Sequence, residues 1–544
     1  MNRLLANKLR IAAVLLVAAM LLSACSKPSA GSKPAAGDQG AGTYDPNGAL
    51  TFVTTSDPTF NPWSPNAYQE SNLINEMLFP GLTRWDKEYK PEADLATEWS
   101  TSPDGLTWTF KLREGVTWTD GQPFTADDVA FTFNNIVLDK KLGANGRSNY
   151  TAVDHVVAVD PLTVQFILKK PFAALPAYLA YYSGILPKHV FEGVTDPWKL
   201  TEFNKKNPIG TGPYKVSQYS EGAYLTLVPN DKYWGGKPKL KSITFKIVPD
   251  PNAQVAQMLA GDVDMIGLSD PAVLDRFKGN SKFDVIAQTQ NIYYFIFLNQ
   301  KDARFQDARV RQALLYAVDR EAMIKNILKG YGTIATGPIA PIQKAYYDPE
   351  VQQYPYDPGK AKQLLADAGW TPGPDGTLQK DGKTLVINMP TAQYQQLTPI
   401  TLLVQQYWQA IGVKAVIKSM DWNSWIKQVV VNRDYEGSVA WWSTPTDPDV
   451  LPYYASDAAE KGSNIPGYKN PMLDQILEQG RAAKTQAERV QIYRQAQELM
   501  AQELPYLYLW YPQILTVRSA KIGGMLEAGQ SAAFAHAVDF YVKR

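Results

Sequence analysis

A single cysteine, Cys25, occurs in this chain of 544 residues, so the sequence excludes an internal disulfide. The fold must therefore rest on a hydrophobic core, and an apolar fraction of 45% is ordinary for a globular protein with a sizeable one. At about 100–200 residues per domain, the length predicts about three domains or one large two-lobed body. The 54 basic and 53 acidic residues nearly balance, so we expect no nucleic acid as a partner. Three histidines argue against a metal centre built from several histidines, and no cofactor is expected.

The surroundings of Cys25 predict export. Residues 1–10 are basic, and the apolar run at residues 11–22 is shorter than the roughly 20 residues that span a bilayer. Leu22–Cys25 reads Leu-Ser-Ala-Cys, which resembles the lipobox of bacterial lipoproteins. This resemblance implies that residues 1–24 are a signal peptide and that acylated Cys25 anchors the protein to the membrane. An ordinary secretory signal with an incidental cysteine is the alternative. Residues 25–47, rich in Gly, Ala, Ser and Pro, are expected to form a flexible tether.

The rest of the chain alternates strand and helix patterns. Strict alternation of apolar and polar residues predicts a strand at Thr107–Arg113. Helical spacing of apolar residues predicts one helix from Asp307 to Gly330, and Asn470-Pro471 is a typical start of another. Tyr506–Tyr511 is a further strand candidate. This interleaving favours an α/β protein in which helices cover the sheets.

Motifs for catalysis and phosphate binding are largely absent from the sequence. The segment GTLQKDGKT at Gly376–Thr384 approaches a phosphate-binding loop, but its glycines are wrongly spaced and a hairpin is the better interpretation. Gly210-Thr211-Gly212 lacks the third glycine of a dinucleotide fingerprint. A carboxylate pair of the glycosidase kind remains open, although no two acids are singled out. We therefore expect a protein that is not an enzyme, with a secreted hydrolase as the alternative.

Several segments, in order, resemble the family 5 extracytoplasmic solute-binding proteins, which are the peptide, dipeptide and nickel receptors of ABC importers. They begin with LATEW and SPDGLTWTFKLREGVTWTDGQPFTADDV between Leu95 and Val129. NPIGTGPYKV, NDKYWGGKPKL and LAGDVDMI follow between Asn207 and Ile266, and DARVRQALLYAVDRE spans Asp307–Glu321. GYKNPMLDQIL and LPYLYLWYP complete the series between Gly467 and Pro512. The resemblance covers nearly all of the chain after Leu50.

This resemblance implies a two-lobed periplasmic-binding-protein-like fold of type II, with a hinge and an extra subdomain in lobe one. The order of segments assigns residues 48–84, 208–291 and 513–544 to lobe one, and residues 85–207 to its inserted subdomain. Residues 292–512 form lobe two. The two hinge strands are expected at Ile292–Phe297 and Leu509–Gln513.

The implied mechanism is capture of a ligand by hinge closure. The expected partners are a peptide ligand, an ABC permease with its separate ATPase subunits, and the membrane; the protein is expected to be a monomer. A nickel–metallophore and an oligosaccharide remain alternative ligands, the sugar because aromatic faces suit sugar rings.

The segment most informative about the ligand is Ser438–Tyr454. Dipeptide and oligopeptide receptors of the resembled family carry an aspartate here that pairs with the α-amine of the peptide, and this chain has Thr444 at the matching position. Threonine supplies no charge for that bond. Either Asp447, Asp57 or another carboxylate takes the role, or the ligand is not a free-amine dipeptide.

Thirteen residues are candidate ligand contacts, each with core packing or an exposed loop as the alternative. Trp441 and Trp442 are adjacent on a strand and face opposite ways, and we favour Trp442 with Ser443 and Thr444 as cleft residues. The full set is Asp57, Phe60, Asn61, Trp63, Arg147, Tyr150, Tyr394, Trp422, Trp441, Trp442, Ser443, Thr444 and Asp447.

Overall fold

The computed structural model describes residues 44–67, 69–181, 184–394, 396–527 and 530–544. Cys25, the expected signal peptide and almost all of the expected tether lie outside these ranges. Residues Asp45–Arg544 cluster as one unit, which we call the body. Over the described residues, we find no helix with the length and apolarity needed to cross a membrane.

Ten strands of the described chain form the main sheet, in the order β20-β13-β21-β11-β1-β10-β9-β8, with β12 and β14 also paired to β21. β1 is parallel to β10, whereas β13 and β21 are antiparallel. The strands are β1 (Ala49–Thr54), β8 (Tyr214–Ser220), β9 (Tyr224–Pro229), β10 (Ser242–Ile247), β11 (Met265–Leu268), β12 (Phe283–Thr289), β13 (Ile292–Leu298), β14 (Gly332–Ile334), β20 (Gly437–Ser443) and β21 (Leu507–Ser519).

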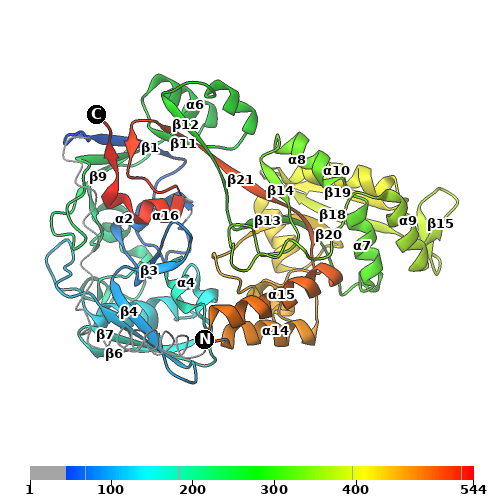
Figure 1. The fold of residues 1–544 in the computed structure, drawn as a ribbon, viewed down its shortest axis with the longest axis horizontal. Coiled ribbons are helices and arrows are strands. Elements are labelled where there is room, and N and C mark those ends of the chain that lie inside the picture. Colours follow the sequence, from blue (N-terminus) through cyan, green and yellow to red (C-terminus); the bar gives the residue numbers. More distant parts are fainter. Residues whose placement is uncertain (1–43, 68, 182–183, 395, 528–529) are drawn as a thin grey trace, which may run out of the picture. The chain divides into compact units, whose positions relative to one another are not determined.

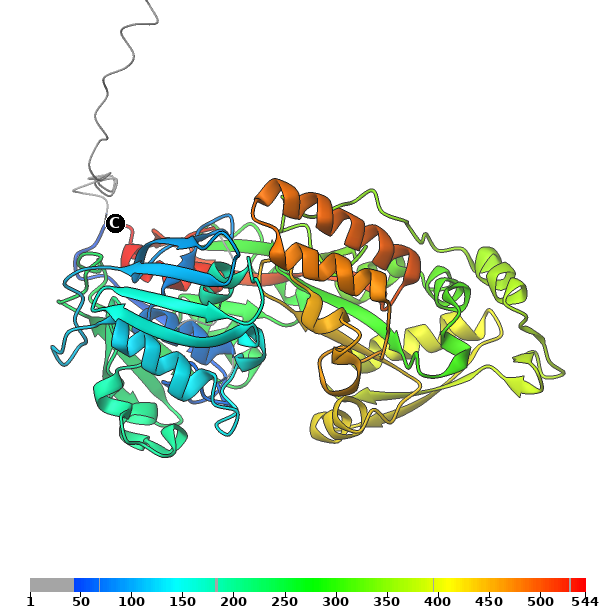
Figure 2. The same ribbon diagram turned by 90° about the horizontal axis from the view of Figure 1, so that it is seen from below.

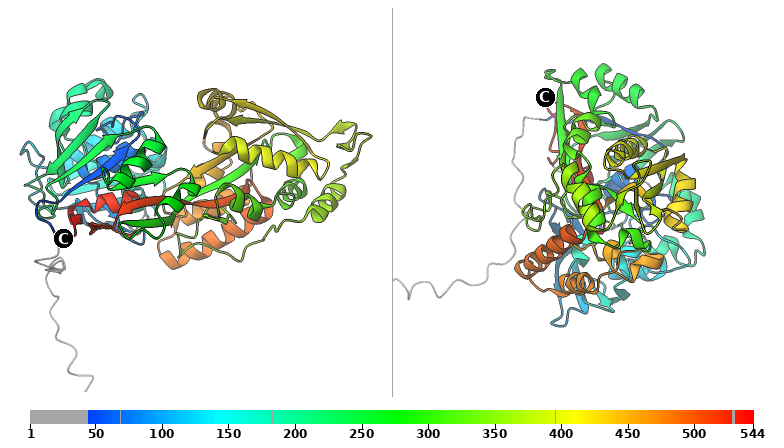
Figure 3. Two further views of the ribbon diagram at one scale, coloured as in Figure 1. Left: turned by 90° about the horizontal axis from the view of Figure 1, so that it is seen from above. Right: turned by 90° about the vertical axis from the view of Figure 1, so that its right-hand side faces the viewer.

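The long strand β21 links two halves of the body (Figures 1 and 3). Its first half pairs with β13 at Leu507, Tyr508 and Trp510, and its second half pairs with β12 over Gln513–Ser519. β12 and β13 follow one another in the chain, so two connections cross between the halves at the same place. Their aromatic and β-branched residues suit strands that are buried in the middle of a sheet.

Two large clusters of buried apolar side chains lie on either side of this crossing. One runs from Leu50 to Phe245 and adds Met265 and residues near the C-terminus, such as Phe534; the other runs from Tyr293 to Tyr511. Separate cores are expected of two lobes that move relative to one another. They support the division into residues 48–84, 208–291 and 513–544 with the insertion 85–207, and residues 292–512, which we keep as a proposal.

Lobe one carries, besides its part of the main sheet, a four-stranded sheet in the order β4-β5-β7-β6. Its remaining elements are α2 (Gln69–Leu78), β2 (Thr83–Trp85), β3 (Pro91–Ala93), β4 (Ala96–Thr101), β5 (Thr107–Leu112), α3 (Ala126–Phe131), β6 (Val153–Asp160), β7 (Thr163–Leu168), α4 (Leu175–Leu179), α5 (Lys188–Phe191), α6 (Pro251–Ala260), β22 (Ile522–Gly523), α16 (Gln530–Ala535) and β23 (Tyr541–Val542). Short 3-10 or π segments lie at Thr132–Val137, Arg147–Tyr150, Pro197–Lys199, Glu202–Lys206, Pro271–Arg276 and Ala537–Asp539.

Lobe two packs helices around β13, β20 and the parallel pair β18–β19. Its remaining elements are α7 (Ala308–Tyr316), α8 (Arg320–Ile327), α9 (Pro358–Asp367), β15 (Thr371–Pro372), β16 (Leu378–Lys380), β17 (Lys383–Thr384), β18 (Val386–Ala392), α10 (Leu397–Gln409), β19 (Lys414–Met420), α11 (Trp422–Trp425), α12 (Leu451–Tyr454), α13 (Ala458–Lys461), α14 (Pro471–Ala482) and α15 (Gln486–Glu503). Short 3-10 or π segments lie at Ala303–Phe305 and Ile426–Val431.

Most expected elements are present, and one is wrong. β5 and α14 begin where the sequence predicts, and Gly376–Thr384 lies in a hairpin whose turn residues, Asp381 and Gly382, have positive φ. The single helix expected from Asp307 to Gly330 is instead α7 followed by α8. The Asp319 side chain accepts a hydrogen bond from the backbone N–H of Ala322 and caps the second helix. An aspartate that caps a new helix competes with continuation of the old one, which the apolar spacing does not reveal.

Candidate functional site

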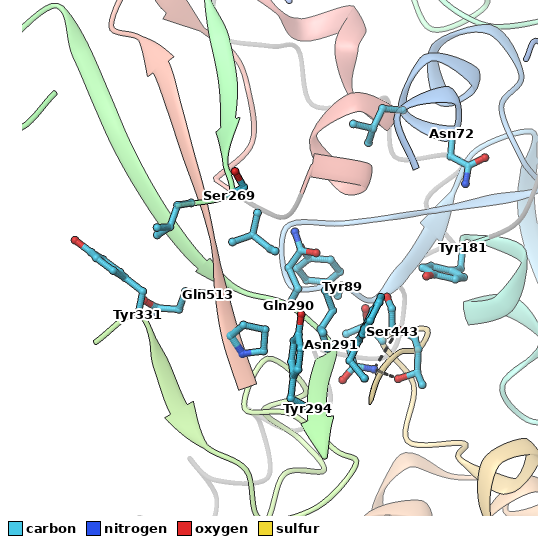
Figure 4. Close-up of a pocket in the computed structure, with 18 of the residues that line it drawn as sticks. Asn72, Tyr89, Tyr181, Ser269, Gln290, Asn291, Tyr294, Tyr331, Ser443 and Gln513 are labelled. Carbon is cyan, nitrogen blue, oxygen red and sulfur yellow. Dashed lines mark hydrogen bonds between the residues drawn. The ribbon is translucent and has the colours of Figure 1, made fainter. Parts of the chain in front are cut away.

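A cavity of about 740 Å³ lies where β12, β13 and β21 cross between the lobes (Figure 4). Both lobes and the hinge strands contribute to this hinge cleft, a name we use for the cavity and its lining residues. Lobe one provides Ala67, Asn72, Leu73, Glu76, Trp85, Tyr89, Asn145, Tyr181, Leu268, Ser269 and Pro271; the crossing provides Gln290, Asn291, Ile292, Tyr294, Pro512, Gln513, Ile514 and Leu515; lobe two provides Leu328, Tyr331, Gln396, Trp441, Ser443, Thr444 and Thr446.

Asn291, just before β13, ties the hinge to the loop that follows β20. Its Nδ2 donates hydrogen bonds to the Oγ1 of Thr444 at 2.5 Å and to the carbonyl of Pro445 at 2.6 Å. Its Oδ1 accepts one from the Nε2 of Gln343 at 2.8 Å, and its carbonyl accepts one from the N–H of Thr444. Thr444 is buried, with 3% of its surface exposed, so its hydroxyl serves the hinge. The hydrogen bonds to Asn291 therefore give Thr444 a structural role at this position.

Tyr294 and Trp441 line the hinge cleft and belong to a larger stack of aromatic rings, whose other members, Trp510 and the sequence candidates Tyr394 and Trp422, are not among the lining residues. The ring of Tyr294 stacks on Trp510 at 5.7 Å and on Trp441 at 5.8 Å, and Trp441 stacks on Tyr394 at 5.8 Å with an interplanar angle of 11°. Trp422 also stacks on Trp441, at 5.6 Å. Burial raises the pKa of Tyr294 to about 12, so its hydroxyl is neutral at physiological pH. The stack presents flat, apolar faces beside the hinge.

Trp442 points to the opposite face of β20, as the strand geometry predicts. Its ring packs against Phe295 and Tyr453, at 6.2 Å and 4.9 Å, and its Nε1 lies 3.5 Å from the hydroxyl of Tyr506. Trp441 therefore lines the hinge cleft and Trp442 does not, although the sequence favoured Trp442. Alternation along a strand requires opposite faces, but only the packing of lobe two determines which face meets the cleft.

The candidates from the first lobe lie outside the hinge-cleft lining. Phe60, Asn61, Trp63 and Tyr150 are fully buried. The Nε1 of Trp63 donates to the carbonyl of Gly184, and its ring packs edge-on against Tyr150. These four residues build the core of lobe one.

Asp57 and Arg147 are also absent from the hinge-cleft lining. Asp57 accepts hydrogen bonds from the hydroxyl of Tyr219 and from the N–H of Gly222, so it closes a loop against β8 and β9. Arg147 is half-buried in a 3-10 segment of the inserted subdomain. The structure therefore brings neither residue to the crossing of the lobes.

Asp447 is held by an arginine. Its carboxylate accepts two hydrogen bonds from Arg489, at 2.7 Å and 3.0 Å, and both side chains are nearly buried. Asp449 makes a similar pair with Arg481. Asp447 lines a second cavity of about 390 Å³, whose lining includes Arg481 and Arg489. A carboxylate already paired in this way is a poor receptor for a ligand amine, because binding would exchange one charge-assisted bond for another.

The lobes also touch beside the cleft, where the inserted subdomain meets α14 and the loop between β20 and α12 (Figure 2). The hydroxyl of Tyr178 donates to the Oδ2 of Asp449 at 3.3 Å, and the N–H of Ala173 donates to the carbonyl of Arg481 at 2.9 Å. Lys170 and Glu478 form an exposed ion pair at 3.0 Å. We call these three links the side contact.

Comparisons with known proteins agree with this architecture. Residues 90–464 match the family described as bacterial extracellular solute-binding proteins, family 5 Middle. The chain belongs to this family. The oligopeptide-binding protein AppA of Bacillus subtilis is 33% identical over 481 residues, which cover 87% of this chain and 88% of AppA.

Solved structures share the fold. The structure of AppA from Bacillus subtilis in complex with a nonapeptide has a TM-score of 0.76 at 30% identity and covers 91% of this chain and 99% of its own. NikZ from Campylobacter jejuni in complex with Ni(L-His) has a TM-score of 0.75 at 27% identity, with the same coverage. This family 5 chain thus has the expected two-lobed, type II periplasmic-binding-protein fold.

Sequence reasoning missed most of the hinge cleft. Gln290 and Asn291 directly precede one expected hinge strand and Gln513 is the last residue of the other, so their position in the sequence could have identified them as hinge residues. Asn72, Tyr89 and Tyr181 carried no such signal (Figure 4). They come from a helix and two loops of lobe one that reach the cleft only through the packing of that lobe.

Proposed function

We propose that this protein is the lipid-anchored, extracytoplasmic substrate-binding subunit of an ABC importer, and that it captures peptides by hinge closure and delivers them to a membrane permease. The observation that carries the proposal is a cavity at the crossing of two lobes in a chain that is 33% identical to an oligopeptide-binding protein. A ligand that contacts both lobes favours the closed state by its differential affinity.

The chemistry of the hinge cleft supports a peptide ligand. Its polar lining includes the amides of Asn72, Asn145, Gln290 and Gln513, a type of side chain that can donate and accept hydrogen bonds. An extended peptide backbone offers the same alternating donors and acceptors whatever its sequence. The aromatic wall adds apolar contact for side chains.

Native mass spectrometry of residues 48–544, purified from cells, tests the peptide assignment. We expect the protein to carry a heterogeneous set of short peptides, which denaturation releases for sequencing. A Trp441→Ala variant prepared in parallel should retain less of this cargo, since it removes part of the cleft wall. A single metal chelate or a sugar as the released ligand would refute the peptide assignment and leave the transport role standing. Steady turnover of a peptide or glycoside library would instead support a hydrolase.

Membrane attachment through Cys25 has its own test. The full chain should incorporate labelled fatty acid and sediment with membranes, and Cys25→Ser should lose both properties because it lacks the thiol that is acylated. Ser23→Ala, a small change two residues earlier, is the matched control. Label that persists in Cys25→Ser would contradict the assignment of the anchor.

A further inference from the structure

The second cavity, of about 390 Å³, adjoins the hinge cleft, and we call it the side cavity. Its lining comes from the inserted subdomain and from lobe two, next to the side contact that joins them. Tyr89, from the inserted subdomain, and Thr446, from lobe two, line both cavities. The two cavities are therefore neighbours, and these two side chains stand at their boundary.

Aromatic rings from both lobes line the side cavity. Trp99 of β4 and Trp108 of β5 lie on one face of the four-stranded sheet, because Trp108 pairs with Thr101, two residues along the strand from Trp99. The Nε1 of Trp108 donates a hydrogen bond to the carbonyl of Phe172 at 3.2 Å, which orients the indole. Tyr346 adds a ring from lobe two. A mainly apolar and aromatic cavity between two domains is typical of a ligand site.

The charged side chains of the side cavity have partners within the protein. Arg489 is paired with Asp447 at 2.7 Å, and Arg481 is paired with Asp449 at 2.8 Å. The Nζ of Lys484 donates to a backbone carbonyl of the inserted subdomain at 2.6 Å. An ionic group on a ligand would have to compete with these partners, whereas an aromatic ring would leave them in place. The cavity therefore suits a neutral aromatic group better than a charged one.

A tight turn fixes the boundary between the two cavities. Tyr89 has a φ of 58°, which is uncommon for an aromatic residue. The carboxylate of Asp86 accepts hydrogen bonds from the N–H groups of Glu88 and Lys90, at 2.7 Å and 2.8 Å, and so holds the turn. The ring of Tyr89 lies 6.3 Å from that of Trp85, which lines the hinge cleft. Backbone conformations of this kind persist where the surrounding structure enforces them, and they cluster at ligand sites.

We propose that the side cavity is a specificity subsite, which takes an aromatic side chain of a peptide whose backbone lies in the hinge cleft and which that side chain enters past Tyr89 and Thr446. The inference rests on the proposed peptide function and deepens it. Burial of an aromatic side chain in the cavity is favourable, whereas a charged side chain would lose its hydration there. Because the walls come from both lobes, a ring bound in the cavity also favours the state in which the lobes are together.

A positional scan of one peptide tests for the subsite. The parent probe is a nonapeptide of alanine and serine, and three sets of probes carry phenylalanine, leucine or glutamate at each of the nine positions in turn. Titration calorimetry measures the affinity of the ligand-free protein for each probe. At one position or two adjacent ones, we expect phenylalanine to bind about tenfold or more tightly than the parent probe, leucine to gain less, and glutamate to bind more weakly than the parent.

Variants of the side cavity show whether it is the source of this gain. Ala482→Trp places a ring at an exposed lining position at the end of α14, and it should fill the cavity and reduce the ratio of the phenylalanine and parent affinities towards one. Trp99→Ala, which removes part of the wall, should reduce the ratio in the same direction. Ala366→Trp is the matched control: it makes the same change at an exposed position of α9 outside the lining of both cavities, and the ratio should stay as in the wild-type protein.

A gain from phenylalanine that survives both Ala482→Trp and Trp99→Ala would place the aromatic preference in the hinge cleft and overturn the subsite. Equal affinity of the wild-type protein for all the probes would also overturn it, and peptide capture would stand in both cases. A released molecule that is not a peptide, and that Ala482→Trp alone fails to retain, would identify a different occupant and refute the proposal. If no probe binds and native mass spectrometry finds no peptide, the proposed function fails and this inference with it.

Discussion

Adjacent residues of one strand can have different roles, one facing the cleft and the next packing inside a lobe. Trp441 lines the hinge cleft, whereas Trp442 packs against Phe295 and Tyr453 inside lobe two. Both side chains are half-buried, so exposure alone does not distinguish them. What separates them is the face of β20 on which each one stands.

We expect Trp441→Ala and Trp442→Ala to affect different measurements. Trp441→Ala should weaken peptide binding about tenfold or more, because it removes an aromatic contact surface from the cleft. Trp442→Ala should lower the free energy of unfolding by about 3 kcal/mol, because it leaves a cavity beside Phe295. Calorimetric binding and urea denaturation of both variants check this, and the reverse pattern would place the cleft on the other face of β20.

Asp94 is a residue whose protonation should affect stability. Burial raises its pKa from 3.8 to about 6, although Arg84 and Arg113 nearby oppose the shift. The folded protein thus holds this proton more tightly than the unfolded chain does. The stability that Asp94 contributes is fully present below about pH 4 and is lost as the pH rises through about 6.

Asp94→Asn should remove this dependence, because asparagine does not titrate. Between pH 4 and pH 7, the free energy of unfolding of the wild-type protein should fall relative to that of the variant by roughly 2–3 kcal/mol. Urea denaturation of both proteins at the two pH values measures the difference. A difference that stays constant with pH would mean that Asp94 titrates normally.

At the scale of elements, the segment Gly210-Thr211-Gly212 acts as a support for α2. The N–H of Gly212 donates to the carbonyl of Leu78, the last residue of that helix. A Cβ on Gly212 would lie 2.2 Å from the carbonyl oxygen of Met77, and one on Gly210 would lie 2.0 Å from that of Leu78. Glycine is therefore required for the close approach to the helix that carries Asn72 and Glu76.

Gly212→Ala should destabilise the protein by more than about 2 kcal/mol, because the backbone of α2 or of the loop must move to admit the methyl group. Gly267→Ala is the matched control, since a Cβ at Gly267 has no atom within 4 Å. Thermal and urea denaturation compare the two variants. Equal, small losses of stability in the two variants would show that the loop at Gly212 can move to admit a methyl group at little cost in free energy.

In the whole molecule, two features connect the lobes and would affect the proposed closure of one lobe on the other: the hinge and the side contact. β12, β13 and β21 connect the two lobes, while Tyr178 and Ala173 join the inserted subdomain to lobe two at Asp449 and Arg481. Interactions made only in one state shift the equilibrium towards that state.

If the side contact belongs to the closed state, Tyr178→Phe should weaken peptide binding about fivefold, because it removes a hydrogen bond to a charged partner. The ligand-free variant should also have a larger radius of gyration in X-ray scattering. Tyr354→Phe, which removes a buried hydroxyl that bonds Ala501 within lobe two, is the control. An affinity equal to that of the wild-type protein would mean that Tyr178 contributes equally to both states.

Local patterns predicted much of the architecture. The hairpin at Asp381-Gly382 and the cap at Asn470 depend on the preferences of a few adjacent residues, and both are present. The break between α7 and α8 escaped prediction because the apolar spacing continues across it while Asp319 starts a new helix. The lobe-one candidates Asp57 and Trp63 proved to serve a loop and a core, since a polar or aromatic residue in a turn has the same sequence signature in either role.

The fold class and the family could be predicted from the amino-acid sequence, because turns, caps and strand patterns are local and their order along the chain is distinctive. The residues that form the cleft could not be predicted in this way. Asn72, Tyr181, Trp441 and Gln513 are far apart in the chain and meet there because two lobes pack around one hinge (Figure 4). The pairing register of β20 with β13 likewise determines that Trp441, and not Trp442, faces the cleft. Such choices depend on long-range packing, in which each side chain's surroundings come from distant segments.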